Sequence, residues 1–295
     1  MNYLYYPGCS LKGTGKAYEE SLLAVCRCLG IGLTEIPDWN CCGATAYMSA
    51  EELKAHALVS RNLALAEDAA AKGGLKREIV APCSACYLVL SKTLHALEDS
   101  PKTRELVTGA LKAGGLDMPK PGLAVRHPLD VLINDVGLEA VKAKIKNPLK
   151  GLKLAPYYGC QIVRPYATFD DQANPVTMDK LVEAAGAECV PFPLKTRCCG
   201  GSLTGTVPEA GLRLAYFILK EAKKRGAQAV VTVCPLCQFN LDGYQDKMAS
   251  VYGAVDMPVL YFTQVLGLAM GLSEEELGIR RGIVSAGPAL AGCRR

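Results

Sequence analysis

The sequence predicts an α/β protein with two pseudo-symmetric, Rossmann-like halves built from βαβ units. Short apolar runs alternate with longer helix-like segments along the chain, and five cysteines recur in the same order in both halves. Alternation of strands with helices is typical of parallel sheets, because parallel strands are joined by crossovers that are usually helical. We expect the two halves to be domains at residues 1–145 and 146–295.

The first half begins with a short apolar run that leads to its first cysteine. The expected elements of this half are strands at 3–6, 32–36 and 78–81 and helices at 17–29 and 50–71. The segment at 100–150 contains no cysteine. It is expected to be a helical connector with loops at 114–115 and 119–122.

The second half repeats this layout. Its expected elements are strands at 152–157, 188–192, 229–233 and 259–262 and helices at 175–185 and 208–225. A helix is expected after the last strand, and Ser273 and Glu276 form a capping-box pattern before Leu277.

The cysteines are the clearest sign of the repeat. The first cysteines of the two halves are 151 positions apart, the Cys-Cys-Gly pairs 157 and the C-x-x-C motifs again 151. The first thiol set is Cys9, Cys41, Cys42, Cys83 and Cys86, and the second thiol set is Cys160, Cys198, Cys199, Cys234 and Cys237. Ligands of parallel α/β sheets lie beyond the carboxyl ends of the strands. Because each set follows three successive strands, we expect its five thiols to converge at one sheet edge.

Composition excludes several classes of protein. The chain has 14 cysteines among 295 residues. Its net charge is only +4 and its basic residues are scattered, which argues against nucleic acid as the main partner. The N-terminus lacks the basic and apolar regions of a secretory signal, and the longest apolar stretch, at 259–272, is too short for a transmembrane segment. We therefore expect a cytoplasmic protein whose reduced thiols are metal ligands or catalytic groups.

Ten cysteines in this pattern favour metal binding. A structural zinc site has four tetrahedral ligands, and five thiolates exceed that number. Adjacent cysteines can bind different metal atoms, and soft thiolates select iron–sulfur clusters or zinc. A redox-active disulfide at each C-x-x-C is an alternative that leaves the Cys-Cys pairs unexplained. No G-x-G-x-x-G or Walker-type loop and no ferredoxin cysteine run is present, so we expect this chain to bind no flavin or nucleotide.

With these motifs the chain resembles the B subunit of heterodisulfide reductase, which contains cysteine-rich CCG domains. The resemblance covers nearly the whole chain, and the segments at 6–10, 37–43 and 259–264 are most similar to bacterial homologues. The gap between Cys42 and Cys83 is a few residues longer than in the family. We expect the surplus to form a surface loop around 72–76.

The resemblance implies that each half is a CCG domain whose five cysteines bind one noncubane [4Fe–4S] cluster. It implies a catalytic subunit that reduces a disulfide or a related sulfur substrate, with each cluster giving one electron and holding one product sulfur. It also implies two partners, a ferredoxin-like C subunit with cubane clusters and a flavin-containing A-type subunit. Two other functions stay open: an electron-transfer iron–sulfur subunit between a flavin dehydrogenase partner and another acceptor, and a zinc-stabilised interaction module.

Outside the cysteines, His127 is the candidate catalytic residue. It stands in a His-Pro-Leu-Asp setting that similar proteins share, where it could protonate a leaving thiolate; a histidine that only begins a helix is the alternative. Arg164, Lys195 and Arg197 lie close to the second thiol set. They are expected to bind an anionic part of a substrate, to offset cluster charge or to form a solvated basic face. Trp39 is expected to shield the first cluster from water.

Overall fold

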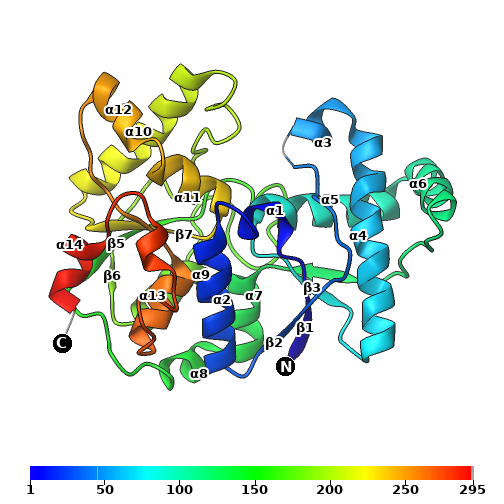
Figure 1. The fold of residues 1–295 in the computed structure, drawn as a ribbon, viewed down its shortest axis with the longest axis horizontal. Helices are drawn as coiled ribbons and strands as arrows, with labels where there is room; N and C mark the ends of the chain where they lie inside the picture. Colours follow the sequence, from blue (N-terminus) through cyan, green and yellow to red (C-terminus); the bar gives the residue numbers. More distant parts are fainter. Residues whose placement is uncertain (45, 294–295) are drawn as a thin grey trace. The chain divides into compact units, whose positions relative to one another are not determined.

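The structure, a computed structural model, describes residues 1–44 and 46–293. These residues form two parallel four-stranded sheets, one in each of two compact units (Figure 1). The first unit comprises residues 1–9 and 30–128, and the second comprises residues 10–29 and those from 129 onwards. The predicted α/β class with two Rossmann-like sheets is confirmed.

The first sheet has the strand order β2-β1-β3-β4. Its strands are β1 (Asn2–Tyr5), β2 (Gly32–Glu35), β3 (Glu78–Val80) and β4 (Ala124–Arg126). Strand β1 pairs with β2 on one side, through Tyr3 and Leu33, and with β3 on the other, through Leu4 and Ile79. Both Tyr3 and Leu4 are fully buried, as expected for a central parallel strand that is covered on both faces.

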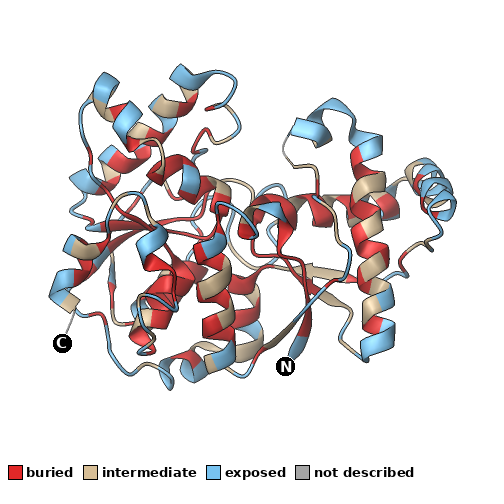
Figure 2. Ribbon diagram, viewed as in Figure 1, coloured by how far each residue is buried: buried red, intermediate tan, exposed pale blue. Residues whose placement is uncertain are grey.

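Helix α1 (Gly8–Leu11) begins in the first unit. Helices α3 (Ala46–Ala50), α4 (Glu52–Gly73), α5 (Ser84–Asp99) and α6 (Pro101–Ala113) lie within it. Ser100 caps α6, since its Oγ accepts a hydrogen bond from the Thr103 amide at 3.2 Å. Gly74 follows the last residue of α4 and caps the helix, with a φ of 60° in the left-handed region that glycine adopts without strain. Most residues of the inner strands β1 and β3 are buried (Figure 2), whereas β2, β4 and α3 contain no buried residue.

Strand β4 corrects the expectation that the segment at 100–150 consists of helices and loops alone. It has only three residues and lies between Gly122 and Pro128, so it offers no apolar run long enough to predict a strand. Its pairing with β3, through Val125 and Ile79, completes the first sheet and places His127 just beyond its carboxyl end.

The second sheet has the corresponding order, β6-β5-β7-β8. Its strands are β5 (Lys153–Tyr157), β6 (Glu188–Cys189), β7 (Ala229–Thr232) and β8 (Val259–Tyr261). All four residues of β7 are buried. The same strand order in both units confirms the internal repeat.

The remaining helices are largely assigned to the second unit. They are α2 (Lys16–Cys28), α7 (Pro128–Asp130), η1 (Val131–Val136), α8 (Leu138–Lys142), α9 (Thr177–Ala184), α10 (Pro208–Lys224), α11 (Pro235–Asp242), α12 (Gln245–Tyr252), α13 (Phe262–Ala269), η2 (Ile279–Arg281), α14 (Gly287–Leu290) and η3 (Ala291–Cys293). Ser273 and Glu276 form both hydrogen bonds of a capping box, at 3.0 and 3.2 Å, but they close a turn rather than begin an α-helix. None of the helices in the described part combines the length and the apolar character needed to cross a bilayer.

Helix α2 belongs to the second unit although its sequence lies in the first half. It packs on α13, where the hydroxyl oxygens of Ser21 and Thr263 are 2.6 Å apart. At the end of β8, the rings of Tyr18 and Tyr261 stack with centroids 4.5 Å apart. The segment that follows Cys9 is therefore held by the second unit. The assignment of 1–145 and 146–295 as the two CCG domains stays a prediction.

Candidate metal centres

The first thiol set lies beyond the carboxyl ends of three neighbouring strands. Cys9 is in α1 directly after β1, the Cys-Cys pair is in the loop after β2, and the C-x-x-C begins α5 after β3. Because these strands are adjacent in the sheet, their loops meet. The sulfurs of Cys9 and Cys41 are 3.7 Å apart, and those of Cys42 and Cys86 are 3.3 Å apart.

The second thiol set has the same placement after β5, β6 and β7. The sulfurs of Cys199 and Cys237 are 3.6 Å apart, and the thiols of Cys160 and Cys198 are hydrogen-bonded. Chain segments separated by 77 residues, from Cys160 to Cys237, therefore bring their sulfurs to one edge of the sheet.

Backbone groups fit closely around both thiol sets. The amide of Gly43 donates to Cys41 Sγ at 3.5 Å, and the amide of Gly200 donates to Cys198 Sγ at 3.3 Å. Such hydrogen bonds favour the thiolate and help to set the reduction potential of a bound cluster. Gly8, at a φ of 69°, lets the backbone approach so closely that a Cβ at this position would lie 2.8 Å from Cys86 Sγ.

A buried tyrosine holds each Cys-Cys loop. Tyr6 Oη donates to the carbonyl oxygen of Asn40 at 2.7 Å, and Tyr157 Oη donates to the carbonyl oxygen of Arg197 at 2.6 Å. Asn40 and Arg197 directly precede the two pairs, and the tyrosines are 151 positions apart, as are the first cysteines. Burial, reinforced by the neighbouring thiolates, raises the pKa of both phenols, so that both remain donors. We call these two contacts the tyrosine clamps.

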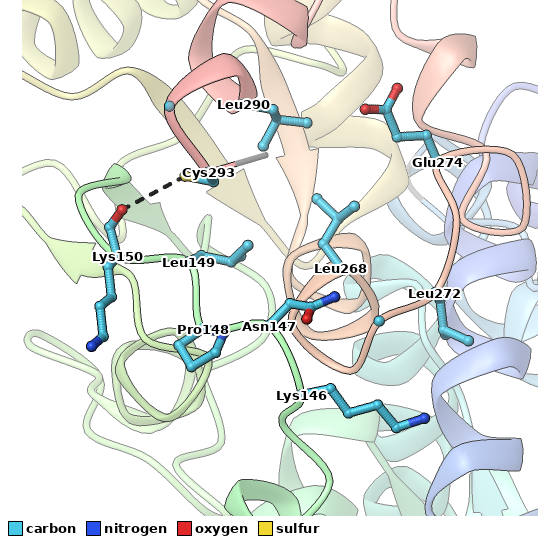
Figure 3. Close-up of a pocket in the computed structure, with 12 residues that line it drawn as sticks. Lys146, Asn147, Pro148, Leu149, Lys150, Leu268, Leu272, Glu274, Leu290 and Cys293 are labelled. Atoms are coloured by element: carbon cyan, nitrogen blue, oxygen red, sulfur yellow. Dashed lines mark hydrogen bonds between the residues drawn. The ribbon is translucent and has the colours of Figure 1, made fainter. Parts of the chain in front are cut away.

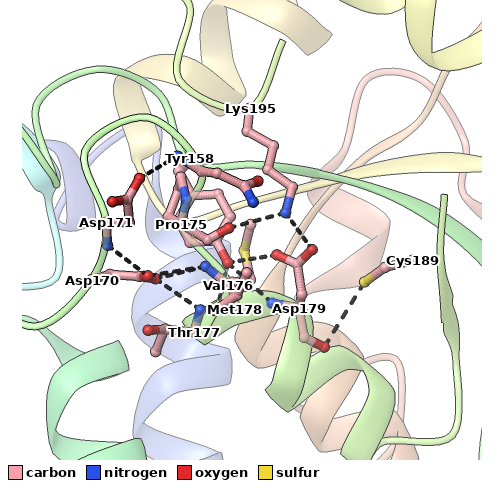
Figure 4. A network of polar contacts seen from close by, with 11 residues as sticks. Tyr158, Asp170, Asp171, Pro175, Val176, Thr177, Met178, Asp179, Cys189 and Lys195 are labelled. Atoms are coloured by element: carbon pink, nitrogen blue, oxygen red, sulfur yellow. Dashed lines mark hydrogen bonds and ion pairs between the residues drawn. The ribbon is translucent and has the colours of Figure 1, made fainter. Parts of the chain in front are cut away.

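The second set has an additional polar network that involves a buried ion pair (Figure 4). Lys195 Nζ is 2.6 Å from Asp179 Oδ1, and Tyr158 Oη donates to Asp179 Oδ2, also at 2.6 Å. The Lys195 carbonyl accepts from the amides of Tyr158 and Gly159, at 2.9 and 3.0 Å. The turn before Cys160 is thereby fixed to the loop that leads to the second Cys-Cys pair.

Comparison with known proteins identifies this architecture. The cysteine-rich domain family CCG matches residues 3–91 and 154–242, which contain the two thiol sets. This chain belongs to the CCG family. Within it, the chain is 30% identical over 291 residues to a Methanosarcina mazei protein, named as the B subunit of ferredoxin:CoB-CoM heterodisulfide reductase, across 96% of this chain and 94% of the relative. The predicted resemblance to the B subunit of heterodisulfide reductase is confirmed.

Other relatives of this CCG protein carry different names. A Wolinella succinogenes protein, named 8-methylmenaquinol:fumarate reductase membrane anchor subunit, is 33% identical over 287 residues, across 96% of this chain and 97% of the relative. Among solved structures, a hypothetical protein from Helicobacter pylori shares the fold with a TM-score of 0.74 and 14% identity. That match covers 96% of this chain and 52% of the other. The named relatives are thus subunits of reductases.

The thiols of the CCG protein change one another's acidity. Hydrogen bonds with Cys41 and Cys86 lower the pKa of Cys42 to about 3, and a hydrogen bond with Cys160 lowers the pKa of Cys198 to about 6. The pKa of Cys86 is raised by its hydrogen bonds with Cys42 and Cys83 and by burial. Each set therefore contains at least one sulfur that is stabilised as a thiolate, the form that binds metal.

The donor chemistry fits an iron–sulfur group. Each thiol set offers five soft thiol donors, one more than a tetrahedral zinc ion takes. The sulfur contacts pair the thiols, such as Cys9 with Cys41 and Cys42 with Cys86. Ligands grouped in this way suit a centre with several metal atoms.

His127 is fully buried and its Nε2 lies 2.9 Å from the carbonyl oxygen of Pro82, directly before Cys83. Its ring also meets the Tyr87 ring edge to face, with centroids 5.9 Å apart. This contact supports the turn that carries Cys83. The predicted role of His127 as a proton donor stays a prediction.

The structure also places the other residues considered near the thiol sets. Lys195 is engaged in its ion pair with Asp179, so it is not a free cation for a substrate. Arg164 donates to a backbone carbonyl, and Arg197 is exposed beside Cys198. Trp39 packs edge-on against the Tyr6 ring, with centroids 5.6 Å apart, and thereby covers one tyrosine clamp.

A cavity of about 500 Å³ lies away from the thiol sets (Figure 3). It is lined by the segment Lys146 to Lys150, which precedes β5, and by Cys293. The Cys293 thiol lies 3.9 Å from the Lys150 carbonyl oxygen. None of the ten predicted ligands lines this cavity.

Loss of a tyrosine clamp is expected to loosen one thiol set. Tyr157→Phe should destabilise the fold by about 1–3 kcal/mol, because the part-buried hydrogen bond to the Arg197 carbonyl is lost. Tyr6→Phe should cost less, since the Asn40 carbonyl also accepts from Asn62 Nδ2 at 2.9 Å. Denaturant unfolding and iron release to a chelator measure both effects.

Tyr216→Phe is the matched control for the clamps, because Tyr216 Oη donates to the Tyr252 carbonyl at 2.8 Å on α10, where no predicted ligand lies. It should lower stability without speeding iron release. Equal iron release in all three variants would show that the clamps do not hold the thiol sets.

Proposed function

We propose that this chain is the iron–sulfur catalytic subunit of a heterodisulfide reductase-like complex. It reduces a disulfide, or a related sulfur substrate, at two noncubane [4Fe–4S] clusters held by the two thiol sets. The observation that carries the proposal is the duplication itself: two equivalent sheet edges each gather five thiols, tied by amide hydrogen bonds and a tyrosine clamp. A purely structural metal site does not require such a pair.

Two equivalent centres suit the chemistry of disulfide cleavage. Reduction of one disulfide consumes two electrons and two protons and gives two thiols. Bound clusters would supply these electrons, one from each thiol set. The two tyrosine clamps hold the loops that carry the Cys-Cys pairs, and Tyr6 and Tyr157 are themselves buried. His127 keeps Cys83 in position and, in this proposal, is also a candidate source of a proton.

The proposal includes partners. The relatives named as B subunits are parts of heterodisulfide reductases, which supports an assembly with a ferredoxin-like C subunit and a flavin-containing A-type subunit. A location in the reducing cytoplasm agrees with 14 cysteines that are all free thiols.

A second candidate function is electron transfer between a flavin dehydrogenase partner and another acceptor. The similarity to the subunit named for 8-methylmenaquinol:fumarate reductase favours this alternative, because that name carries no sulfur substrate. Exposure of the oxidised protein to substrate thiols separates the two functions. New thiol-dependent EPR signals are expected for disulfide reduction and not for a relay.

Metal analysis is the first test. Protein purified without oxygen should contain about eight irons and as many sulfides per chain, if each thiol set holds a four-iron cluster. Zinc in place of iron would overturn the proposal and support an interaction module. A content of about four irons per chain would restrict the proposal to one cluster.

A further inference from the structure

Two buried hydroxyls close to the C-x-x-C motifs have no hydrogen-bond partner among the described residues. One is Ser84 Oγ, directly after Cys83. The other is Thr232 Oγ1, two positions before Cys234. Ser84 is 1% exposed and Thr232 is fully buried, so bulk solvent does not reach either hydroxyl. Because nearly all buried polar groups of native proteins are hydrogen-bonded, both hydroxyls call for an acceptor outside the described chain.

The position of Ser84 directs its hydroxyl toward the first thiol set. Ser84 is the first residue of α5, and the side chains of a helix are tilted toward its N-terminus. A serine inside a helix can donate to the carbonyl four residues earlier, but here that residue, Val80, belongs to β3. Cys83 precedes the helix without capping it, and the sulfur of Cys86, in the first turn, lies 3.3 Å from that of Cys42. We therefore expect the acceptor of Ser84 on the side where these sulfurs lie.

Thr232 is directed toward the second thiol set by its sheet. It is the last residue of β7 and is in register with Tyr157 of β5. Residues in register on neighbouring strands project from the same face of a sheet. On that face the Tyr157 hydroxyl donates to the carbonyl of Arg197, directly before the second Cys-Cys pair. The Thr232 hydroxyl therefore lies on the sheet face that leads to the second set.

The two hydroxyls occupy different positions of the repeat. At the 151-residue spacing, Pro235 stands in place of Ser84, and Ala81 stands in place of Thr232. Proline offers neither a hydroxyl nor an amide hydrogen, and alanine offers no side-chain donor. Each thiol set thus has one unpartnered hydroxyl, but the two come from opposite sides of the first C-x-x-C cysteine. Duplication of a sequence does not produce this pattern, whereas a need for one donor at each bound group does.

We propose that Ser84 and Thr232 each donate a hydrogen bond to a sulfur of the iron–sulfur group held by their thiol set, and thereby make that group easier to reduce. The inference rests on the proposed function in that each set must hold such a group. Reduction adds one electron, supplied by the electron-donating partner, and so makes the sulfurs better acceptors. The donor therefore stabilises the reduced form more than the oxidised form. The hydroxyl keeps its proton throughout.

The test uses the full chain with its iron content confirmed, and redox titration followed by EPR as the readout. Ser84→Ala and Thr232→Val remove the two hydroxyls with little change of shape. Each variant should lower one of the two midpoint potentials and leave the other unchanged, and the two variants should affect different potentials. The expected shift is about threefold to tenfold in the ratio of reduced to oxidised group at a fixed potential, or about 30–60 mV for one electron.

Ser91→Ala is the matched control, because Ser91 is buried on the same helix, two turns or roughly 10 Å beyond Ser84. Ser60→Ala removes another unpartnered hydroxyl, on α4, which adjoins no cysteine in the sequence. Both controls should leave both potentials unchanged. Pulsed EPR of protein reconstituted with iron and sulfide in D2O gives a second readout. One coupled deuteron should be lost in Ser84→Ala and one in Thr232→Val, and none in the controls.

A potential that stays unchanged in either hydroxyl variant would overturn the inference for that set and indicate a buried water as the acceptor. Equal shifts of both potentials in one variant would also overturn it, because they would show a general structural effect. Ser84→Thr, which keeps a hydroxyl, should retain the wild-type potential. A wild-type protein that holds no iron would instead overturn the proposed function.

Discussion

Replacing Cys198 by alanine is expected to abolish disulfide reduction and to remove about half of the iron. Loss of a direct ligand should exceed the roughly 10- to 100-fold cost of losing an outer-shell partner. The first thiol set should keep its iron, because its sulfurs contact one another within their own unit. Cys41→Ala should give the mirror result. Iron analysis, EPR and turnover with a small disulfide measure the three effects.

Cys189→Ala is the matched control for these variants. Cys189 is a half-buried thiol at the end of β6, nine positions before Cys198, and its sulfur contacts the Asp179 carbonyl at 3.9 Å. This variant should keep both its iron and its activity. Disulfide reduction that survives the loss of either cluster, with the loss proved by iron analysis, would falsify the two-cluster mechanism and favour the electron-transfer alternative.

Lys195→Met is expected to destabilise the protein by about 3–5 kcal/mol, because it leaves the carboxylate of Asp179 buried without its cation. Only 11% of the Lys195 side chain and 14% of the Asp179 side chain are exposed, so solvent screens the pair little. The same change removes the side-chain link of the loop that leads to Cys198 and leaves only the hydrogen bonds of the Lys195 carbonyl. Iron should therefore be released faster from the second set than from the first. Urea unfolding and chelator kinetics, followed by EPR, test both results.

Two further variants separate this ion pair from general effects of substitution. Lys180→Met, at an exposed position of α9, should change stability by no more than about 0.5 kcal/mol. The double variant Lys195→Met with Asp179→Asn should lose less stability than the sum of the single changes, because the two side chains interact directly. Additive losses would show that the ion pair does not stabilise the second thiol set.

The cysteines made much of this protein predictable from sequence. Each cysteine motif follows the carboxyl end of a strand. The spacing of the motifs therefore predicted the strand before each motif, and it also predicted that the thiols converge. The tyrosine clamps had a visible signal as well, since Tyr6 and Tyr157 share the 151-residue spacing of the cysteines. Their donor role was not predictable, because it depends on which carbonyl the folded loop presents.

Other features left no local signal. Strand β4 is too short for its period to be recognised, and its position follows only from pairing with β3. The ion pair between Lys195 and Asp179 joins residues 16 positions apart, and neither is distinguishable from a surface residue in the sequence. The packing of α2 on α13 depends on the tertiary structure, which contains two similar sheets. The periodicity of a sequence shows that a helix has an apolar face, but it does not show which element covers that face.

The position of α2 governs how this protein can be divided or recombined. Residues 10–29 lie in the first repeat but supply Tyr18 and Ser21 to the packing of α13. Cutting the chain between residues 145 and 146 would strip that layer from the C-terminal fragment and leave the N-terminal fragment with an amphipathic helix and no surface to cover. Chimeras that exchange halves between members of the family should therefore transfer residues 10–29 together with the C-terminal half, because the two repeats are interleaved rather than joined end to end.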